Sequence, residues 1–310
     1  MNEKIYSKDF IEMLRNQLDT SSYKYVSYPK LVFLCGKAKD SNYNNSSRGK
    51  LERYLLTHSS EIHIVLSESI WEDNSEGDID LLTFEEFLAE TSDYIVLFVE
   101  SPGSCCELGA FAYNEIIFSK KLTIVIDKSF ENDKSFIQIG PTTKAKKDGA
   151  TVVYAPIFQS SLLSSEGLRD VANGIIQECT PAFVSAKNKR IPNKGSTILV
   201  NTFILELLDL LHLLQPISPN DLLEIYKLLK GINSFFTFVK SDGKSFHQEI
   251  TYSTIINLLI KLKVITSENS LLKIIHDDKI QSIMLNMTKT VHNKERNRLL
   301  CRKYKYGECK

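Results

Sequence analysis

The stretch DYIVLFVESPGSCCELGAFAYNE, residues 93 to 115, limits the possible folds of this chain more than any other part of it. Tyr94 to Val99 form an unbroken apolar run rich in Val and Ile, which is typical of a strand covered on both faces in a parallel sheet. A polar turn from Glu100 to Ser104 follows, and helix-forming residues run from Glu107 to Ile117. Glu107 is therefore expected in the first turn of a helix, at the carboxyl end of a buried strand, where open α/β sheets bind ligands.

Further segments of strand character alternate with segments of helical character along the first half of the chain. The expected strands are Lys30 to Cys35, which ends at Gly36, then Glu61 to Leu66, Leu122 to Ile126 and Thr151 to Tyr154. The expected helices are Lys8 to Leu18, Arg48 to Thr57, Thr83 to about Glu90, and Ser164 to Cys179. Thr83, three residues before Glu86, is expected to open its helix with a capping box. The alternation predicts an α/β fold with a Rossmann-like, mostly parallel sheet flanked by helices.

From Ile198 the composition changes to Leu, Ile and Lys, which indicates a second domain. Residues 198–214, 220–232 and 252–266 have helical character, and residues 265–275 are expected to form a β-hairpin with Glu268 and Asn269 near its turn. This inventory fits a winged helix and, equally, a helical domain that dimerises. The predicted organisation is an N-terminal helix and connector (1–29), an α/β domain (30–185), a linker (186–197) and a C-terminal, mainly helical winged-helix-like domain (198–310).

A basic tail ends the chain and slightly favours the winged-helix interpretation. Between residues 289 and 310 the basic side chains outnumber the acids Glu295 and Glu308. They stand beside Tyr304 and Tyr306, which suits phosphate contact with base stacking, although most basic tails are only solvated. The candidate nucleic-acid-binding residues are Lys294, Arg296, Arg298, Arg302 and Lys303. If the tail binds DNA, truncation after Met287 is expected to weaken binding and flatten its salt dependence.

Length and composition exclude several classes of protein. The chain has 310 residues, of which 43% are hydrophobic and 25% charged, as in globular proteins with room for two domains. Its formal net charge of zero gives no overall attraction to nucleic acid or membrane. No apolar run is long enough to span a bilayer, the first residues lack the pattern of a secretory signal, and six irregularly spaced cysteines suggest neither disulfides nor a zinc site. A reducing cytoplasm is the expected location.

The turn between the central strand and its helix has the chemistry of a sugar or nucleotide site. Backbone amides of a glycine-containing loop and of a helix N-terminus favour a phosphate or a sugar hydroxyl. Glu107 is expected to be stabilised by the helix dipole and to stay ionised, so that it can attack or stabilise an oxocarbenium-like carbon. Glu100, at the end of the strand, can orient sugar hydroxyls or the leaving group.

Simpler explanations of the same residues stay open at this point. Glu107 can be only a favourable acid in a first helical turn, which by composition is more common than catalysis. Capping accounts for one of the adjacent acids Glu85 and Glu86. Cys35 is more readily a packing residue than a nucleophile, because no histidine is close in sequence. Ser104 lacks the Gly-x-Ser-x-Gly pattern of a hydrolase nucleophile.

The motif GSCCELGAFA, residues 103–112, resembles the signature of nucleoside deoxyribosyltransferases: glycine, a hydroxyl residue, two variable residues, glutamate, an aliphatic residue and glycine. In those enzymes the glutamate is the glycosyl nucleophile, which implies that role for Glu107. They also use an acid about two turns before the aspartate that opens the strand, which corresponds to Glu85, and one just before the glycine loop, which is closest to Glu100. Ser104 stands where threonine is common in the transferases, so the resemblance does not imply a preference for deoxyribose.

The chain is still more similar to the deoxyribosyltransferase-like effector proteins of type II retrons. The shared blocks are FLCG at 33–36, the acid-bearing helix that leads into Asp93, ESPGS at 100–104, ELGAF at 107–111, KSF at 134–136 and GP at 140–141. They cover the first half of the chain in the same order. In that family the second half is a winged-helix-like DNA-binding domain.

This resemblance implies a toxic effector of a retron antiphage defence system, restrained by the retron reverse transcriptase and by msDNA, a branched RNA-linked DNA. It implies hydrolysis of the N-glycosidic bond of a nucleotide, with NAD as the expected substrate, water as the acceptor and no cofactor or metal. Glu107 is then the catalytic residue, and the candidate substrate-binding residues are Gly36, Glu85, Glu100, Ser101, Gly103 and Ser104. A transferase that moves a sugar between bases, and a nucleotide-sensing DNA-binding regulator without turnover, are the alternatives. No membrane partner is expected, and assembly into homo-oligomers is left open.

Overall fold

The computed structural model describes residues 8, 10–12, 30–37, 40–59, 62–71, 79–113, 121–157, 166–178, 197–232 and 235–275. Contacts within the chain divide it into two compact units. The sheet unit consists of Ser27–Ala182 and Lys240–Gln248, and the helical unit consists of Met1–Val26, Phe183–Val239 and Glu249–Lys310. Lys240–Gln248, which the sequence predicts within the C-terminal domain, therefore groups with the sheet unit.

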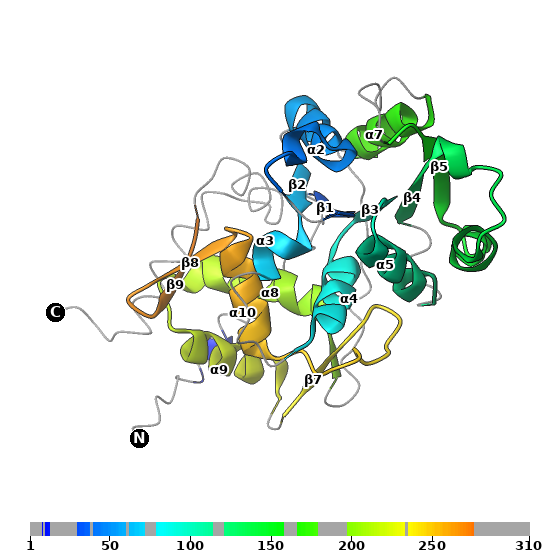
Figure 1. The fold of residues 1–310 in the computed structure, drawn as a ribbon. Helices are drawn as coiled ribbons and strands as arrows, with labels where there is room; N and C mark the ends of the chain where they lie inside the picture. The colour runs from blue at the N-terminus through cyan, green and yellow to red at the C-terminus, as the bar shows by residue number, and fades with distance from the viewer. Residues whose placement is uncertain are drawn as a thin grey trace. The chain divides into compact units, whose positions relative to one another are not determined.

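The sheet unit is built on a five-stranded parallel sheet, as the sequence predicts (Figure 1). Its strands are β1 Lys30–Cys35, β2 Ile62–Val65, β3 Tyr94–Val99, β4 Leu122–Asp127 and β5 Thr151–Ala155. They lie in the order β2-β1-β3-β4-β5, and every neighbouring pair is parallel. The inner strands are apolar on both faces because helices cover both sides of the sheet, so their sequences are continuous runs rather than alternating ones.

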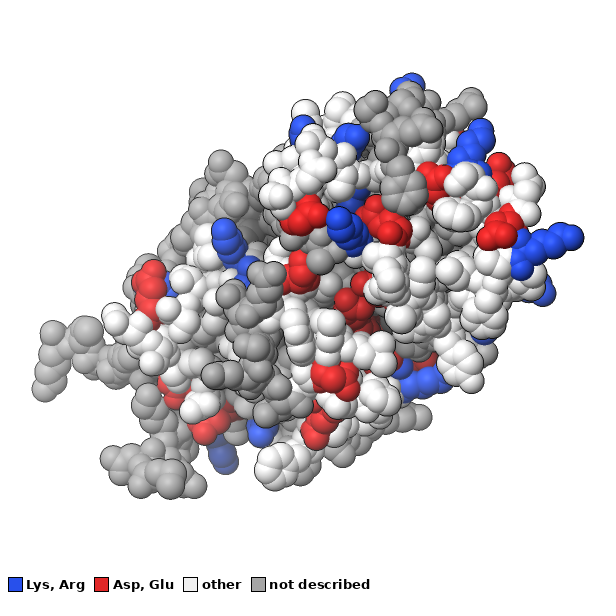
Figure 2. Space-filling model, in the orientation of Figure 1, with Lys and Arg blue, Asp and Glu red and all other residues white. Residues whose placement is uncertain are grey.

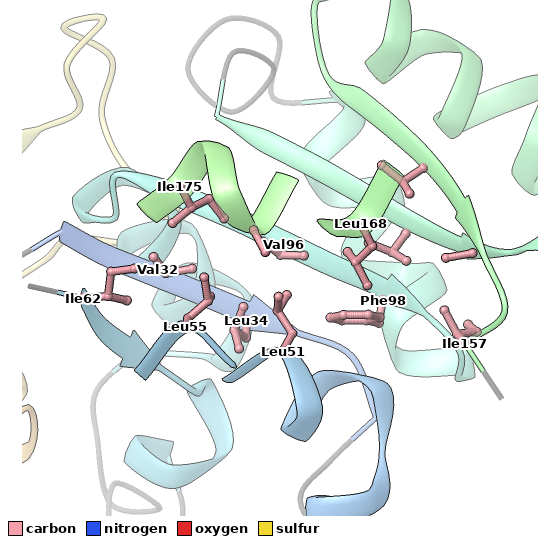
Figure 3. Close-up of a cluster of buried hydrophobic side chains, with 14 of the residues drawn as sticks. Val32, Leu34, Leu51, Leu55, Ile62, Val96, Phe98, Ile157, Leu168 and Ile175 are labelled. Carbon is pink, nitrogen blue, oxygen red and sulfur yellow. The ribbon is translucent and has the colours of Figure 1, made fainter. Parts of the chain in front are cut away.

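Two pairs of helices cover the two faces of this sheet (Figure 1). Helices α2 Ser47–His58 and α7 Glu166–Glu178 cover one face, where Val32, Leu34, Val96 and Phe98 meet leucines and isoleucines of the helices (Figure 3). Successive strand residues point to opposite faces, so Phe33 and Leu97 lie on the other side. Helices α4 Leu81–Thr91 and α5 Pro102–Tyr113 cover that side, and Phe111 of α5 meets Phe33 edge to face at 6.4 Å between ring centroids.

Helix α2 begins where a serine caps it and a glycine lets it lie against the preceding turn. The Ser46 side chain accepts a hydrogen bond from the Gly49 amide at 3.0 Å, the usual arrangement at an N-cap. The 3₁₀ turn η1, Tyr43–Asn45, lies so close that a Cβ at position 49 would be 2.2 Å from the Tyr43 carbonyl oxygen. This close contact fixes the first turn of α2, which carries Arg48.

Helix α4 begins two residues earlier than predicted, and its cap is a different residue. Asp80 is the N-cap, and its Oδ1 accepts a hydrogen bond from the Thr83 amide at 2.7 Å. The predicted capping box from Thr83 to Glu86 is therefore wrong, because an acceptor three residues upstream already satisfies the first orphan amides. Glu86 is left for a different contact, with Lys240.

Helix α5 begins five residues earlier than predicted, so Pro102, Gly103 and Ser104 are helical instead of forming a turn. Proline is favoured at a first helical position, where its missing amide costs nothing. Glu107 is the sixth helical residue and lies in the second turn, so the expectation of a first-turn position is wrong. Residues 114–117 of the predicted helix lie outside the described residues.

The remaining elements of the sheet unit are short and follow the strands. The helix α3, Ser67–Trp71, follows β2, and the 3₁₀ turn η3, Lys128–Phe130, follows β4. The π-helix η4, Gln138–Thr142, leads into α6, Thr143–Lys147, before β5. Gln138 joins this segment to the sheet because its Oε1 accepts a hydrogen bond from the Tyr154 hydroxyl at 2.9 Å.

The helical unit contains the helices and the hairpin that the sequence predicts, and also a pair of strands that it does not. Its helices are α8 Val200–Leu214, α9 Pro219–Lys230 and α10 Tyr252–Lys261. The strands β8 Ile265–Glu268 and β9 Leu271–Ile274 form the antiparallel hairpin, with Asn269 and Ser270 at positive φ in its two-residue turn. The strands β6 Thr197–Leu199 and β7 Thr237–Val239 form an unpredicted parallel pair. The winged-helix assignment stays a prediction.

Some predicted segments lie partly or wholly outside the described residues. Residues 8 and 10–12 are helical, but the rest of the predicted helix from Lys8 to Leu18 is outside. The linker up to residue 196 and the basic tail are also outside, and with the tail the five candidate nucleic-acid-binding residues. Among the helices that the structure describes, none combines the length and apolar character needed to cross a bilayer.

Candidate functional site

The candidate site lies at the carboxyl ends of β1 and β3, which are neighbours in the sheet. The chain leaves β1 towards α2 on one face and leaves β3 towards α5 on the other, so the connections diverge between these strands. Such a switch point forms a crevice that binds ligands in open α/β sheets, and the order 2-1-3-4-5 places it between β1 and β3. Gly36 follows β1 and Glu100 follows β3, so both predicted site residues border the crevice.

Gly36 and Glu100 are in close contact across the two strand ends. The Gly36 backbone has φ +151°, and a Cβ there would be 3.1 Å from Glu100 Oε1 and 3.2 Å from Phe98 Cβ. The same Glu100 oxygen accepts a hydrogen bond from the Lys37 amide at 3.1 Å. Burial raises the pKa of Glu100, while this hydrogen bond opposes the rise. A glycine is therefore needed at position 36 so that the Glu100 carboxyl group can reach the end of β1.

Ser101 and Ser104 fasten the start of α5 to the end of β3. Ser104 donates its amide hydrogen to Ser101 Oγ at 3.2 Å, and Ser104 Oγ accepts from the Ser101 amide at 2.9 Å and from the Glu100 amide at 3.0 Å. These reciprocal bonds have the form of a capping box with serine in place of the usual acid. Ser104 is fully buried, whereas Gly103 is exposed. The predicted serines are thus brought together, and they hold the turn that orients Glu100 and Glu107.

Glu107 is a half-buried acid with one buried, unsatisfied oxygen. Its Oε2 is shielded from solvent and has no hydrogen-bond partner in the part of the chain that the structure describes. Burial, with a further contribution from the negative charge of Glu85, raises the pKa of Glu107 to about 8. The expectation that the helix dipole keeps Glu107 ionised is therefore wrong, because the residue lies beyond the first turn and burial outweighs the dipole.

Glu85 reaches the same place from α4 and is held by a serine. It is 7% exposed, and its Oε1 accepts a hydrogen bond from Ser67 Oγ at 3.1 Å. Burial raises its pKa, and the bond from Ser67 acts in the opposite direction. The structure thus brings together Glu85 and Glu107, which are 22 positions apart on two different helices. Two neighbouring acids that are largely shielded from solvent do not both ionise readily without a nearby positive charge.

Arg48 supplies that positive charge and was missed by sequence reasoning. It is 1% exposed, its guanidinium forms an ion pair with Glu68, and its Cζ lies 5.1 Å from the centroid of the Tyr43 ring. Its positive charge lowers the pKa of Glu107 and of Glu100 against the effect of burial. No local motif marks Arg48, because its partners are distant in sequence. The one available signal was an arginine at the start of the helix that returns from β1.

The remaining chemistry of the crevice concerns a buried cysteine, Cys35, and groups of side chains that could bind a metal ion. The Cys35 thiol is buried. Burial, as the main cause, and the charge of Glu107, as the second, raise the pKa of this thiol well above the usual value. Such a thiol is suited to packing rather than to nucleophilic attack. Within the described residues no group of His, Cys, Asp and Glu side chains could hold a metal ion. Figure 2 shows acidic side chains at the surface around α4 and α5. The site therefore offers carboxyl groups, fixed backbone and one buried guanidinium.

Comparison with known proteins gives relatives along most of the chain. The chain is 30% identical over 241 residues to the Escherichia coli protein named retron Ec86 putative ribosyltransferase/DNA-binding protein, a match over 74% of this chain and 75% of the relative. It is 27% identical over 226 residues to the corresponding retron Ec73 protein of Escherichia coli, over 67% and 69% of the two chains. A family model described as STM3845 retron effector protein matches residues 44–294. This match spans both units, from the acid-bearing crevice into the helical unit, and the chain therefore belongs to the STM3845 retron effector protein family.

Proposed function

We propose that this retron effector hydrolyses the N-glycosidic bond of NAD, with Glu107 as the nucleophile or as the stabiliser of the oxocarbenium-like carbon. The observation that carries the proposal is the buried Oε2 atom of Glu107, which has no protein partner in the described residues, on the helix that follows β3 at the switch point of the sheet. A carboxyl group left unpaired in a buried place costs stability, so a function is the expected reason for keeping it. The names of both relatives, which include a putative ribosyltransferase, support glycosyl-bond chemistry.

The charges of the crevice favour a substrate whose base is positively charged. Glu68, Glu85, Glu100 and Glu107 act there against the single buried guanidinium of Arg48. The nicotinamide ring of NAD carries a positive charge on the nitrogen that bonds to ribose. A cation bound beside Glu107 lowers the pKa of this carboxyl group and so produces the ionised form that the reaction needs. A purine nucleoside, whose base is neutral, would not have this effect.

The proposed reaction requires little proton transfer from the protein. As the bond between C1′ and the pyridinium nitrogen breaks, its electron pair passes to that nitrogen and neutral nicotinamide leaves. Glu107 in its ionised form attacks or stabilises C1′, and a water molecule then supplies the hydroxyl group of ADP-ribose. The water proton passes to a carboxylate, and we assign this role to Glu85, which is held by Ser67. Glu100 is fixed by the Lys37 amide and is proposed to bind the ribose hydroxyls.

The test is release of nicotinamide from NAD by the purified full chain, with Glu107→Gln as the matched control. We expect kcat/KM to rise with pH and to reach half its maximum near pH 8, because the free enzyme must lose the Glu107 proton and the pKa of that group is about 8. A profile that falls over this range, or turnover by Glu107→Gln equal to that of the wild type, would rule out the proposed role of Glu107.

Transfer of the ribosyl group is the second candidate, and the names of the relatives favour it. Hydrolysis and transfer differ only in the acceptor that reaches C1′. Addition of a free base to the reaction separates them, because a transferase forms a new nucleoside or nucleotide whereas a hydrolase continues to form ADP-ribose. Absence of base release from NAD and from a panel of nucleosides, with every retron component removed, would leave only a nucleotide sensor without turnover.

Membership of the retron effector family supports the proposal that the retron restrains this activity. We propose that the reverse transcriptase and msDNA bind the effector in the cytoplasm, and that the helical unit and the basic tail contact the nucleic acid. The printed names of both relatives include DNA binding, which supports this part. Co-expression tests it: growth should stop when the effector is expressed alone and continue when the reverse transcriptase and msDNA accompany it.

A further inference from the structure

A nine-residue segment of the C-terminal half, Lys240–Gln248, packs on the helix that carries Glu85. We call this segment the strap. It belongs to the sheet unit by its contacts, although the chain enters it from β7 and leaves it towards α10, which are both elements of the helical unit. Figure 1 shows the strap as the yellow segment beside α4. Both of its ends continue covalently into the helical unit, while its contacts with α4 are non-covalent, so the strap links that unit to α4.

The strap contacts α4 along the whole length of the helix. At the start of α4, the Asp80 amide donates a hydrogen bond to Gln248 Oε1 at 2.9 Å. In the middle, Phe246 meets Phe87 edge to face at 5.9 Å between ring centroids. At the end, the Ser241 amide donates to Glu90 Oε1 at 2.8 Å. The contacts join residues about half the chain apart, so they hold α4 in one position along its axis and in one rotation.

The strongest of these contacts is a buried ion pair one position from Glu85. Lys240 Nζ lies 2.7 Å from Glu86 Oε1, and the two side chains are only 6% and 11% exposed. Glu86 Oε2 accepts a further hydrogen bond from the His247 amide at 3.0 Å. A buried, fully bonded pair loses its geometry when either partner moves, because each charge then remains without compensation. The pair therefore fixes the backbone of α4 at Glu86 and, with it, the origin of the neighbouring Glu85 side chain.

We propose that the strap is a positioning device for the glycosidic reaction, in which Lys240, through Glu86, holds Glu85 beside Glu107, and that the helical unit controls turnover by pulling on the strap. The proposal rests on the proposed function of the site. Only Glu249, Ile250 and Thr251 separate the strap from the first residue of α10, so a ligand that displaces α10 also displaces Gln248. Turnover proceeds when the strap contacts α4 and stops when the strap is displaced from this helix.

Lys240→Met and Glu86→Gln test the positioning role. Lys144→Met is the matched control, because Lys144 also pairs with a carboxylate of the sheet unit, Asp148 at 2.8 Å, but on α6. We expect both strap variants to lower kcat by roughly ten- to a hundredfold, the effect of a misplaced catalytic group, and the control to leave kcat unchanged. The double variant Lys240→Met with Glu86→Gln leaves no unpaired buried charge, so it keeps the test open if Lys240→Met alone does not fold.

A readout that a merely structural role would not change is the pH midpoint of kcat/KM. The charge of Glu85 helps to raise the pKa of Glu107, whereas Arg48 and Glu68, which also act on Glu107, are not carried by α4. Displacement of Glu85 should therefore lower the pH midpoint of kcat/KM in the strap variants from about 8. Glu85→Gln should lower this midpoint too, and Lys144→Met should leave it unchanged. Wild-type kcat and midpoint in a folded strap variant would overturn the proposal.

Hydrogen exchange separates failure of this proposal from failure of the proposed function. If the wild type releases no base from any substrate, the proposed function fails, but the strap is still tested by exchange in α4. The amides of residues 81–91 should exchange faster in Lys240→Met than in the wild type, while those of α5 should not change. Equal protection of α4 in both proteins would show that the strap does not hold this helix.

A short Gly-Ser insertion between Gln248 and Glu249 tests control by the helical unit. The insertion leaves the strap contacts in place and loosens their connection to α10. With a double-stranded DNA oligonucleotide as the probe, we expect the DNA to lower turnover of the wild type and to have no effect on the insertion variant, whose basal turnover is kept. Equal inhibition of both proteins, or no response of the wild type, would overturn the controlling role of the strap.

Discussion

The two faces of the sheet are built from the same strands but differ in what they bury. Under α2 and α7, the sheet packs mainly against apolar side chains, such as Leu55, Leu168 and Ile175 (Figure 3), and the buried polar residues Ser47 and Arg48 are confined to the first turn of α2. Under α4 and α5, apolar packing by Phe33 and Phe111 is interrupted at the carboxyl edge by the acids Glu85 and Glu107. Away from the first turn of α2, the first face follows the rule that buried groups are apolar, and the second breaks it at the proposed ligand site.

This difference indicates how the sheet unit divides stability and function between its faces. Burial of apolar surface stabilises the fold, whereas burial of carboxyl groups with few partners destabilises it. The acids are tolerated because the α2 and α7 face and the strap contacts hold the unit together. Substitutions under α2 and α7 should therefore lower stability, and substitutions of the acids under α4 and α5 should lower turnover.

Glu107→Gln should produce the largest effect on turnover and leave the folding of the chain intact. Loss of the proposed nucleophile is expected to lower nicotinamide release by at least roughly a thousandfold. The variant should fold, since an amide fills the same volume. Measurement of kcat beside a thermal unfolding curve checks both statements, and a drop in kcat that follows a drop in folded fraction would contradict them.

Leu55→Ala should break the apolar face and leave the chemistry intact. Leu55 is fully buried between α2 and the sheet, so truncation leaves a cavity and should cost about 2 to 5 kcal/mol of unfolding free energy. Denaturant unfolding measures the loss. At a temperature where the variant is folded, its kcat should equal that of the wild type, and a selective loss of kcat would show that the two faces are not separate in function.

The stability of the wild type should depend on pH through Glu107, and Glu107→Gln should remove this dependence. The folded-state pKa is about 8, above the ordinary 4.5, so between these values the unfolded chain has lost the proton while the folded chain retains it. The unfolding free energy contributed by this group therefore falls as pH rises from 4.5 to 8. Glu107→Gln should be more stable than the wild type at pH 9, by an amount on the order of a few kcal/mol, and not at pH 4. The difference between the two unfolding curves cancels other titrating groups.

Gly36→Ala should damage both the fold and the site, because it acts at their boundary. The φ of +151° is strained for any residue with a Cβ, and the new atom would press on Glu100 Oε1 at 3.1 Å. We expect a loss of roughly 1 to 3 kcal/mol in stability and a raised KM, since Glu100 must move. Gly174→Ala in α7, where a Cβ would meet no atom within 4 Å, is the matched control and should change neither quantity for the worse.

Asp80→Ala should give the smallest effect and distinguish the observed cap from the predicted one. Loss of the bond from the Thr83 amide is expected to cost about 1 kcal/mol, the usual value for an N-cap. If the predicted capping box were the true cap, Thr83→Val would produce this loss instead. Thermal unfolding of the two variants decides between them.

The sequence predicted the strands closely because their signal is local. β1 and β3 have the bounds that their apolar runs predict, β4 and β5 each extend one residue further, and β2 is one residue shorter at each end. Glu85, Glu100 and Glu107 were also predicted as site residues, from the resemblance and from the polarity change after β3. The start of α5 was missed because Pro102 and Gly103 favour turns in sequence, while in the fold Ser101 caps a helix that begins with them.

The remaining features of the site depend on contacts that no local pattern contains. Arg48 meets Glu68, 20 residues later, and its role follows from its burial and from the acids that the fold brings near it. The ionisation state of Glu107 could not be predicted either, because it is set by burial and by Glu85 on another helix. Lys240 meets Glu86 across 154 residues, so the strap could be recognised only in the folded chain.

If the strap positions Glu85 as proposed, its position in the sequence sets the moment at which a newly made chain can become active. Translation proceeds from the N-terminus, and β1 to β5 are complete before residue 240 leaves the ribosome. Until then α4 lacks Lys240 and Ser241, the partners of Glu86 and Glu90. The strands of the sheet are thus made before Glu85 can be held in place, and α10, through which the proposed control acts, is made directly after the strap.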